Sequence, residues 1–211
     1  AQKESHLAAI IGGEAQASLA YIEPQARFNL NHVVTRAVLD GSDWVINGFK
    51  GVVLGAPSAD LLIVSARTDG DEQAEEGITL FIVPAIAEGV SRRNYPTIDG
   101  FRASEVTLSD VRVSAESVLG DVSQGLATLQ YAIDQGILVV GAEAVGAMEV
   151  LYKDTVEYCK TREQFGQAIG KFQVLQHRMV DMFIEHEQTK SLAYMAAMRL
   201  AEEYNGCLLY T

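Results

Sequence analysis

Cysteine is scarce in this chain. Only two occur among its 211 residues: Cys159 lies within a helical pattern, and Cys207 lies close to the end of the sequence. Disulfide-stabilised scaffolds and cysteine zinc sites both need more thiols than this. We therefore expect both cysteines to be reduced thiols that are buried or without a chemical role.

Basic residues and long apolar runs are also in short supply. The chain has 16 Lys and Arg residues against 28 Asp and Glu residues, a formal net charge of -12, which argues against a nucleic-acid partner. No uninterrupted apolar run reaches the roughly 18 to 20 residues of a membrane span, and the first residues lack the pattern of a signal peptide. We predict a soluble, cytoplasmic protein with no membrane span.

Several catalytic motifs are absent. The sequence contains no G-x-S-x-G elbow, no P-loop and no G-x-G-x-x-G fingerprint, so serine hydrolysis and Rossmann-type dinucleotide binding are not supported. His177 and His186 do not share a helix face in the i, i+4 manner of a metal site. We interpret both histidines as solvent-facing and predict no metal.

The first half of the chain has the pattern of a β domain. Residues 1–13 read as the end of a helix that Gly12 and Gly13 terminate. Residues 15–113 form short β-rich runs, separated by Asp-Gly and Asn-Gly turn signals. Strands at this spacing, without helices between them, favour an antiparallel barrel or sandwich.

The second half predicts two long helices. The first begins near Asp121 or Ser123 and runs to about Thr161, and the second runs from about Lys171 to Tyr204. Two antiparallel helices of this length cannot cover their own apolar stripe, so we expect a partner chain.

Three glycines interrupt the first of these helices, at Gly136, Gly141 and Gly146. Each interior glycine costs about 1 kcal/mol relative to alanine. Small residues allow another backbone to approach closely, which is typical of a helix buried in a bundle. We therefore expect the first helix to pack closely against other helices.

The connection between the two helices, TREQFGQAIGKFQVLQH, is richer than a simple loop. It places Arg162, Phe165 and Gln173 around two glycines. A guanidinium matches a phosphate or pyrophosphate, an aromatic ring stacks on a flat ring, and a carboxamide both donates and accepts hydrogen bonds. The alternative is structural: Arg162 would pair with Glu163 or Glu157, and Phe165 would plug the space between the helices.

The segment YCKTREQFGQAIGKFQVLQHRMVDM resembles the R-x-x-F-G-x-x-I-x-x-F-Q-x-x-Q-x-x-x-A-D-M segment of the acyl-CoA dehydrogenase family of flavoproteins. Upstream, IEP, DWVINGFKGVVLGAPSADLLIVSART and GITLFIVP resemble the middle domain of the same family, in the same order. The resemblance extends from about Ala8 to Ala201. It implies that the chain is a fragment with an α+β fold.

The implied domains follow the family order. Residues 1–14 correspond to the end of an N-terminal helical domain, and residues 15–115 to an antiparallel β-barrel middle domain. Residues 116–211 correspond to the first two helices of a four-helix-bundle domain, which form a long helical hairpin.

The resemblance also implies roles for individual residues. Arg162, Phe165 and Gln173 match family positions that reach across a dimer interface to the pyrophosphate and adenosine half of FAD, bound mainly to the neighbouring subunit. The main chain of Tyr21 and Ile22 matches the segment that holds the flavin ring. These five residues are the predicted cofactor-binding site.

Four of the departures from the family pattern remove a contact to the flavin or to CoA. Ile22 replaces a hydroxyl residue that bonds the flavin, Phe28 replaces a serine that meets the CoA arm, and Val52 and Leu54 replace an aromatic and a hydroxyl residue that pack on the flavin. Each lost neutral hydrogen bond is worth about 1 kcal/mol, which weakens FAD binding without excluding it. These substitutions resemble a divergent branch typified by pimeloyl-CoA dehydrogenase small subunits.

The catalytic base is not identified by the sequence. One of the two family positions for the glutamate base matches Gly136, which has no side chain to take a proton, and the other lies beyond this chain. Glu143 lies on the same predicted helix about two turns away and is interpreted as structural.

The resemblance therefore implies an FAD-dependent acyl-CoA dehydrogenase that acts on an acyl-CoA thioester, passes electrons to an electron-transfer flavoprotein and forms a dimer or tetramer. The fragment by itself is expected to be inactive. The alternative is a non-catalytic partner subunit of a heteromeric dehydrogenase, which contributes FAD contacts across the interface.

Overall fold

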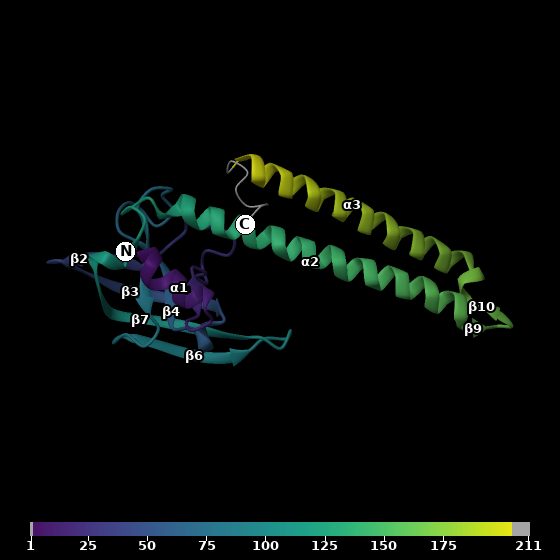
Figure 1. Cartoon of the computed structure of the whole chain (residues 1–211), viewed down its shortest axis with the longest axis horizontal. Helices are drawn as coiled ribbons and strands as arrows, with labels where there is room; N and C mark the ends of the chain where they lie inside the picture. Colours follow the sequence, from purple (N-terminus) through teal and green to yellow (C-terminus); the bar gives the residue numbers. More distant parts are fainter. Residues whose placement is uncertain (1, 204–211) are drawn as a thin grey trace. The chain divides into compact units, whose positions relative to one another are not determined.

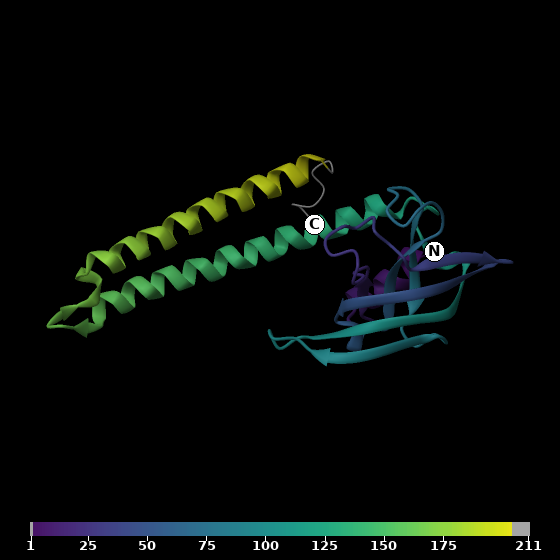
Figure 2. The same cartoon turned by 180° about the vertical axis from the view of Figure 1, so that it is seen from behind.

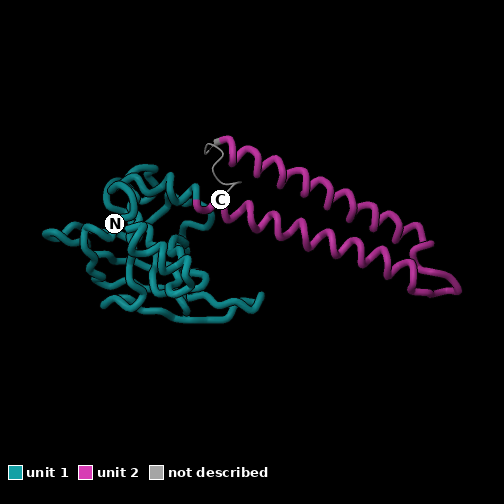
Figure 3. Tube along the Cα trace, viewed as in Figure 1, with its two compact units in different colours: residues 1–131 teal, residues 132–211 magenta. Residues whose placement is uncertain are grey.

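The computed structural model of the chain describes residues 2–203. The predicted helix end at Tyr204 and the thiol of Cys207 lie outside this range. The chain forms two compact units, residues 1–131 and 132–211 (Figure 3). Unit 1 contains the sheet, and unit 2 contains most of a helical hairpin. The three domain boundaries expected from the sequence stay predictions.

The first helical segment ends as the sequence predicts. A π-helical turn, η1 (Lys3–Leu7), leads into α1 (Ala8–Ile11). The N–H of Gly12 donates to the carbonyl of Ala8, and Gly13 has a φ of 72°, the left-handed conformation that glycine adopts at helix C-termini.

Unit 1 is built on one eight-stranded sheet (Figure 1). Its strands are β1 (Ala17–Ala20), β2 (Arg36–Asp40), β3 (Asp43–Leu54), β4 (Leu61–Arg67), β5 (Ile78–Pro84), β6 (Val90–Pro96), β7 (Arg102–Ser114) and β8 (Val118–Leu119). Short 3-10 turns, η2 (Ala56–Ser58) and η3 (Ala115–Ser117), follow β3 and β7. The β-rich character predicted for this half of the chain is confirmed.

The expectation of a closed antiparallel barrel is wrong. The strands follow the order β6-β7-β3-β2-β4-β5-β8 as an open path, and β1 pairs with β4 in parallel. Closure fails for a physical reason at each end. At one end, strand β8 has only two residues and offers few hydrogen-bonding groups. At the other end, β6 carries exposed polar residues such as Ser91 and Arg93, which disfavour pairing with a further strand.

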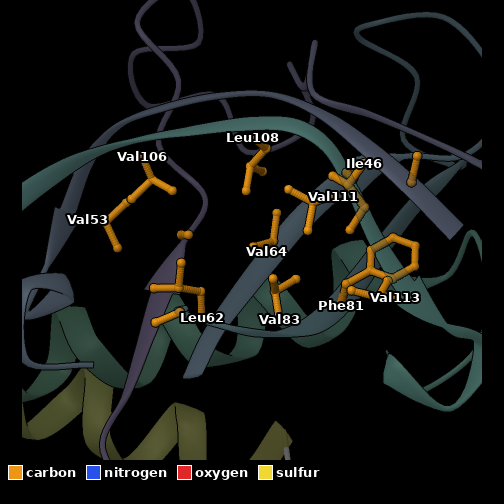
Figure 4. Close-up of a cluster of buried hydrophobic side chains, with 14 of the residues drawn as sticks. Ile46, Val53, Leu62, Val64, Phe81, Val83, Val106, Leu108, Val111 and Val113 are labelled. Atoms are coloured by element: carbon orange, nitrogen blue, oxygen red, sulfur yellow. The ribbon is translucent and has the colours of Figure 1, made fainter. Parts of the chain in front are cut away.

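The core of unit 1 lies on the inner face of the bent sheet. Alternating apolar residues of β3, β4, β5 and β7 meet there, among them Ile46, Val64, Val106 and Leu108 (Figure 4). The rings of Trp44 and Phe81 pack edge to face with centroids 5.6 Å apart. This core fixes the strands from which the flavin-binding main chain is predicted to project.

The two predicted long helices are confirmed. They are α2 (Gly125–Thr161) and α3 (Gln173–Glu203), which run side by side as a hairpin in both views (Figures 1 and 2). Helix α2 starts slightly later than predicted, at Gly125, which sits tightly against β5: an added Cβ there would lie 3.0 Å from the carbonyl oxygen of Ile78.

Much of the hairpin surface is apolar and uncovered. Exposed large apolar side chains lie on both helices: Ile137, Val139, Val140, Val150, Leu151, Val174, Val180, Phe183, Leu192, Met195 and Met198. A Cβ added at Gly136, Gly141 or Gly146 would meet nothing within 4 Å. The close packing expected at these glycines is thus not made within residues 2–203, and the partner that we expect on this face stays a prediction.

One helix bears on the expectation that the chain has no membrane span, which stays a prediction. By length and composition, α2 is apolar enough to cross a membrane. A core helix of a soluble protein passes the same test. Cys159, near the end of α2, is a free and buried thiol, as predicted.

Candidate functional site

The hairpin connection folds into a small β-hairpin of its own. Strands β9 (Glu163–Gln164) and β10 (Gln167–Ala168) pair antiparallel, and a 3-10 turn, η4 (Ile169–Lys171), leads into α3. The two residues at the bend, Phe165 and Gly166, have φ values of 52° and 79°. Positive φ at both central residues is the geometry of a type I′ turn, which Asn-Gly normally occupies.

Phe165 is therefore held in a conformation that bulky residues rarely adopt. Its side chain is 92% exposed, and its nearest aromatic neighbour is Phe172, with ring centroids 6.1 Å apart in an edge-to-face arrangement. The alternative in which Phe165 plugs the space between the helices is wrong. A backbone outlier that carries an exposed aromatic ring is the kind of local strain that marks binding sites.

Arg162 has a fixed main chain and a free side chain. Its N–H donates to the carbonyl of Tyr158, and its own carbonyl accepts from the N–H of Ile169, both over 2.8 Å. Within residues 2–203 the guanidinium has no hydrogen-bond or ion-pair partner. Glu157, which the structural alternative paired with Arg162, instead accepts from the Nζ of Lys160 at 2.6 Å.

Gln173 is the first residue of α3, and its side chain is exposed. Phe172 precedes it in an extended conformation, and its carbonyl accepts the N–H groups of Leu175 and Gln176. The first turn of a helix presents main-chain N–H groups and the positive end of the helix dipole. The amide of Gln173 thus lies where an anionic group is favoured.

Gly170 sets the distance between this turn and the end of α2. A Cβ at Gly170 would lie 2.9 Å from the carbonyl oxygen of Cys159, so only glycine allows the backbones to approach this closely. The hairpin therefore gathers Arg162, Phe165 and Gln173 at its bend. An unpaired guanidinium, an exposed ring and a helix N-terminus suit a ligand with phosphates and a flat ring, and the residues fit one half of a dinucleotide.

Tyr21 and Ile22 belong to unit 1, whereas the bend belongs to unit 2. Ile22 forms an isolated antiparallel bridge with Val52, and its carbonyl accepts the N–H of Gly51 at 2.9 Å. Tyr21 is half-buried, and burial raises the pKa of its phenol. The main chain predicted to hold the flavin ring is thus fastened to an irregular part of β3.

A buried ion pair lies next to this segment and was missed by the sequence analysis. The Nζ of Lys50 donates to Oε1 of Glu23 at 2.7 Å, and both side chains are almost fully buried. Burial opposes the charge on Glu23, but the Lys50 ammonium and the hydrogen bonds to the carboxylate outweigh it and lower the pKa of Glu23. Burial lowers the pKa of Lys50 to about 8, with Glu23 opposing the shift.

A sequence signal for this pair did exist. Strand β3 alternates buried and exposed positions, and Lys50 falls on the buried phase, as Trp44 and Ile46 do. A lysine among inward-facing apolar residues requires a buried counter-charge. Glu23 is 27 positions away, so only the fold identifies it as the partner.

Three of the four residues that replace family contacts are exposed, whereas Ile22 is half-buried. Phe28 is 99% exposed on the loop that follows Pro24, beside Arg27 with a φ of 53°. Val52 and Leu54 also expose their side chains along β3. These apolar groups make no hydrogen bond through their side chains, so they contribute only surface to whatever binds there.

The histidine interpretation is half wrong. His177 is exposed, but His186 is 2% exposed because it packs against Tyr152 of α2, with ring centroids 5.2 Å apart. Its Nδ1 lies 3.1 Å from Oε1 of Glu187, a contact that pairs charges only when the imidazole is protonated. Neither ring nitrogen has a hydrogen-bond partner in the described part of the chain.

No candidate base is brought to either half of the site within residues 2–203. Gly136 is on the exposed part of α2, and Glu143 is exposed on the same helix. No cluster of His, Cys, Asp and Glu that could hold a metal ion occurs in this range.

Comparison with family profiles gives two matches that follow each other along the chain. Residues 18–111 match the profile described as acyl-CoA dehydrogenase, middle domain, and residues 123–205 match acyl-CoA dehydrogenase, C-terminal domain. The second match includes the whole hairpin bend.

Curated relatives match nearly the whole chain. The chain is 34% identical to a 3-(aryl)acrylate reductase of Clostridium sporogenes, and the match covers 94% of this chain and 53% of the relative. It is 33% identical to a probable acyl-CoA dehydrogenase of Bacillus subtilis, over 93% and 52% of the two chains. The chain thus spans about half the length of the curated relatives it matches.

Solved structures match in the same proportion. Butyryl-CoA dehydrogenase from Megasphaera elsdenii superposes with a TM-score of 0.86 at 30% identity, over 96% of this chain and 54% of that one. The prolyl acyl carrier protein oxidase AnaB superposes with a TM-score of 0.88 at 32% identity, over 95% and 54% of the two chains.

Proposed function

Because the chain belongs to the acyl-CoA dehydrogenase family, we propose that the protein containing it is an FAD-dependent acyl-CoA dehydrogenase. Members of this family are FAD-dependent flavoproteins. The implied reaction is the α,β-dehydrogenation of an acyl-CoA thioester. The observation that carries the proposal is the hairpin bend, with its unpaired Arg162 and exposed Phe165.

We assign the bend to one half of FAD. Arg162 would bind the pyrophosphate through its planar fork, and Phe165 would stack on the adenosine half. Gln173 would donate to or accept from the same half at the start of α3. Because these three side chains are exposed, we propose that they reach FAD bound mainly to a neighbouring subunit in a dimer or tetramer.

We assign the flavin ring to the main chain of Tyr21 and Ile22. Their segment is immobilised by the bridge to Val52 and by the hydrogen bond from Gly51. The side chain of Ile22 has no hydroxyl, so only its main chain is available as a polar contact. Val52 and Leu54 would contact the ring or substrate through apolar surface.

The chemistry balances as follows. A carboxylate removes the α-proton of the thioester, and a hydride leaves the β-carbon, so that the substrate gains a double bond and loses two electrons. FAD, when bound, supplies the acceptor for that hydride, and an electron-transfer flavoprotein removes the electrons afterwards. Gly136 cannot act as the base, and we propose that the base is provided from outside these residues.

We further propose that the protein works in the cytoplasm as a soluble oligomer. In this account α2 is a core helix of the complete helical domain, and its exposed apolar face is covered there by other helices. The carrier of the acyl group is assigned to coenzyme A because the relatives named for their activity on thioesters include a butyryl-CoA dehydrogenase.

A second function, a non-catalytic partner subunit, is favoured by one set of observations. Ile22, Phe28, Val52 and Leu54 all replace polar or aromatic contacts to flavin or CoA with apolar groups, and three of them, Phe28, Val52 and Leu54, are exposed. In that case the chain would donate Arg162 to FAD held by a catalytic sister chain and would hold no flavin by itself.

A single spectrum separates these functions. The full-length protein that contains this chain is purified alone, and its visible flavin absorbance is recorded before and after anaerobic addition of acyl-CoA. The enzyme is expected to show flavin absorbance that bleaches on addition. A colourless protein that gains flavin only with a co-expressed sister subunit would support the partner function instead.

A further inference from the structure

We propose that Glu23 and Lys50 are positioning residues for the flavin ring, an inference that rests on the function proposed above. They are the two residues that flank the fastened main chain. Ile22 is followed directly by Glu23, and Gly51 is preceded directly by Lys50. The backbone link from Gly51 to Ile22 therefore has a buried ion pair of 2.7 Å immediately beside it.

The pair is fully connected to its surroundings. The carboxylate of Glu23 accepts from Lys50 Nζ at 2.7 Å, Val34 N at 2.8 Å, Thr35 N at 3.2 Å and Gln25 Nε2 at 2.6 Å, and Lys50 Nζ also donates to Ser65 Oγ at 3.1 Å. These contacts join the segment after β1, the segment before β2, and strands β3 and β4. Any movement of the Ile22 main chain would have to break several of them.

The irregular course of β3 makes this anchor necessary. The β3–β7 register shifts between Lys50 and Val53, so Gly51 and Val52 bulge out of the ladder. A bulge leaves main-chain groups without sheet partners and re-aims the residues around it. Tyr95 donates to the carbonyl of Gly51 at 3.3 Å, and the bridge to Ile22 holds the rest of the bulge.

Stability alone gives little reason to retain this pair. Buried ion pairs can often be replaced by apolar residues of similar volume without loss of stability, because desolvation of the charges offsets their attraction. The neighbouring core is apolar and could accommodate such residues. An apolar pair could not accept hydrogen bonds from the N–H groups of Val34 and Thr35, as the Glu23 carboxylate does. It therefore could not fix the direction of the adjoining main chain.

The pair also sets the local charge. Together Glu23 and Lys50 are neutral. Removal of Lys50 leaves the Glu23 carboxylate buried without its ammonium, whereas removal of Glu23 takes away the group that opposes the lowering of the Lys50 pKa by burial and so favours the neutral amine. A reduced flavin carries more negative charge than an oxidised one, so a nearby cation favours the reduced form and a nearby anion opposes it.

The test uses the FAD-loaded full-length protein and three variants: Glu23→Gln, Lys50→Met and the double variant. We expect Lys50→Met, which leaves the buried Glu23 carboxylate without its ammonium, to lower the flavin midpoint potential. Glu23→Gln, which favours the neutral amine of Lys50, is expected to shift the potential less. The double variant keeps the site neutral and is expected to restore the potential, but to raise the FAD dissociation constant about tenfold, because the main chain loses its anchor.

A matched control is Glu105→Gln, which removes the partner of Arg93 in an exposed ion pair of the same sheet. This variant should leave both flavin quantities at wild-type values. If a single-charge variant fails to fold, the dissociation constant of the double variant decides the question.

Two failures remain distinguishable. A wild-type protein that binds no FAD would overturn the proposed function itself. A wild-type protein that binds FAD, with all folded variants at wild-type potential and affinity but reduced melting temperature, would overturn only the positioning role.

Discussion

At the scale of single residues, the decisive features are an exposed charge without a partner and a pair of charges that are buried together. Arg162 has no partner within residues 2–203, whereas Lys50 and Glu23 are buried together. The first was recognisable from its motif. The second was not, because the alternation along β3 places Lys50 on the buried face of the strand but does not identify the carboxylate that pairs with it.

The buried pair makes the stability of the protein depend on pH in two windows. The folded pKa of Glu23 is below its unfolded value, so its stabilisation is present above about pH 4.3 and is lost as pH falls through the folded pKa. The folded pKa of Lys50, about 8, is below its unfolded value of about 10.4. Between these values the unfolded state binds more protons, so the free energy of unfolding rises with pH.

The measurement is the free energy of unfolding of the wild type minus that of the Glu23→Gln/Lys50→Met double variant, at several pH values. This difference should fall at acidic pH and grow between about pH 8 and pH 10.4. A difference that stays constant with pH would contradict the assigned ionisation of the pair.

His186 provides a second prediction at this scale. Its two ring nitrogens are buried without hydrogen-bond partners in the described chain, and an unsatisfied buried polar group costs about 1–3 kcal/mol. We expect His186→Leu to raise the free energy of unfolding by about 1 kcal/mol, because leucine removes the two unsatisfied ring nitrogens.

Exposed His177 on the same helix is the matched position, and His177→Leu should bring no such gain. A loss of stability on substitution of His186 would show that its nitrogens find a partner outside residues 2–203.

At the scale of elements, the helices were more predictable than the sheet. Apolar periodicity and the glycines that follow Ile11 locate α2, α3 and the end of α1 to within a few residues, because each helix closes its own hydrogen bonds. Strand pairing depends on distant segments instead. Nothing local indicates that β1 joins β4 in parallel, or that a two-residue β8 leaves the sheet open.

At the bend of the hairpin, substitutions should affect the stability of the protein and its affinity for FAD differently. Phe165 has a φ of 52°, and a left-handed conformation costs roughly 1–2 kcal/mol for a residue with a side chain. Without FAD, the Phe165→Gly variant is expected to unfold at the same temperature as the wild type or at a higher one. Its FAD dissociation constant is expected to rise about tenfold, because the stacking ring is lost.

Gly166→Ala is the control with the opposite pattern. Gly166 has a φ of 79° and open space around it, so alanine should cost about 1 kcal/mol of stability while the aromatic ring stays in place. Equal effects of the two substitutions on FAD affinity would contradict a contact between Phe165 and the cofactor.

At the scale of the whole molecule, the chain is about half of a family member. Its family and α+β architecture could be predicted because the motifs IEP and R-x-x-F-G recur in register along the sequence. Its catalytic base could not, because the only matching position within the chain is Gly136. The apolar face of the hairpin that residues 2–203 leave uncovered, and the guanidinium without a partner in this range, are the features from which we propose that the function belongs to an assembly.

The most direct test of the account is therefore FAD retention by the assembled full-length protein with Arg162→Ala. Loss of charge-assisted hydrogen bonds worth about 2 kcal/mol predicts a roughly thirtyfold higher FAD dissociation constant. Lys160→Ala, which removes a neighbouring cation already paired with Glu157, should leave this constant unchanged. An Arg162→Ala protein that retains FAD with wild-type affinity would contradict the central claim that the hairpin bend binds the cofactor.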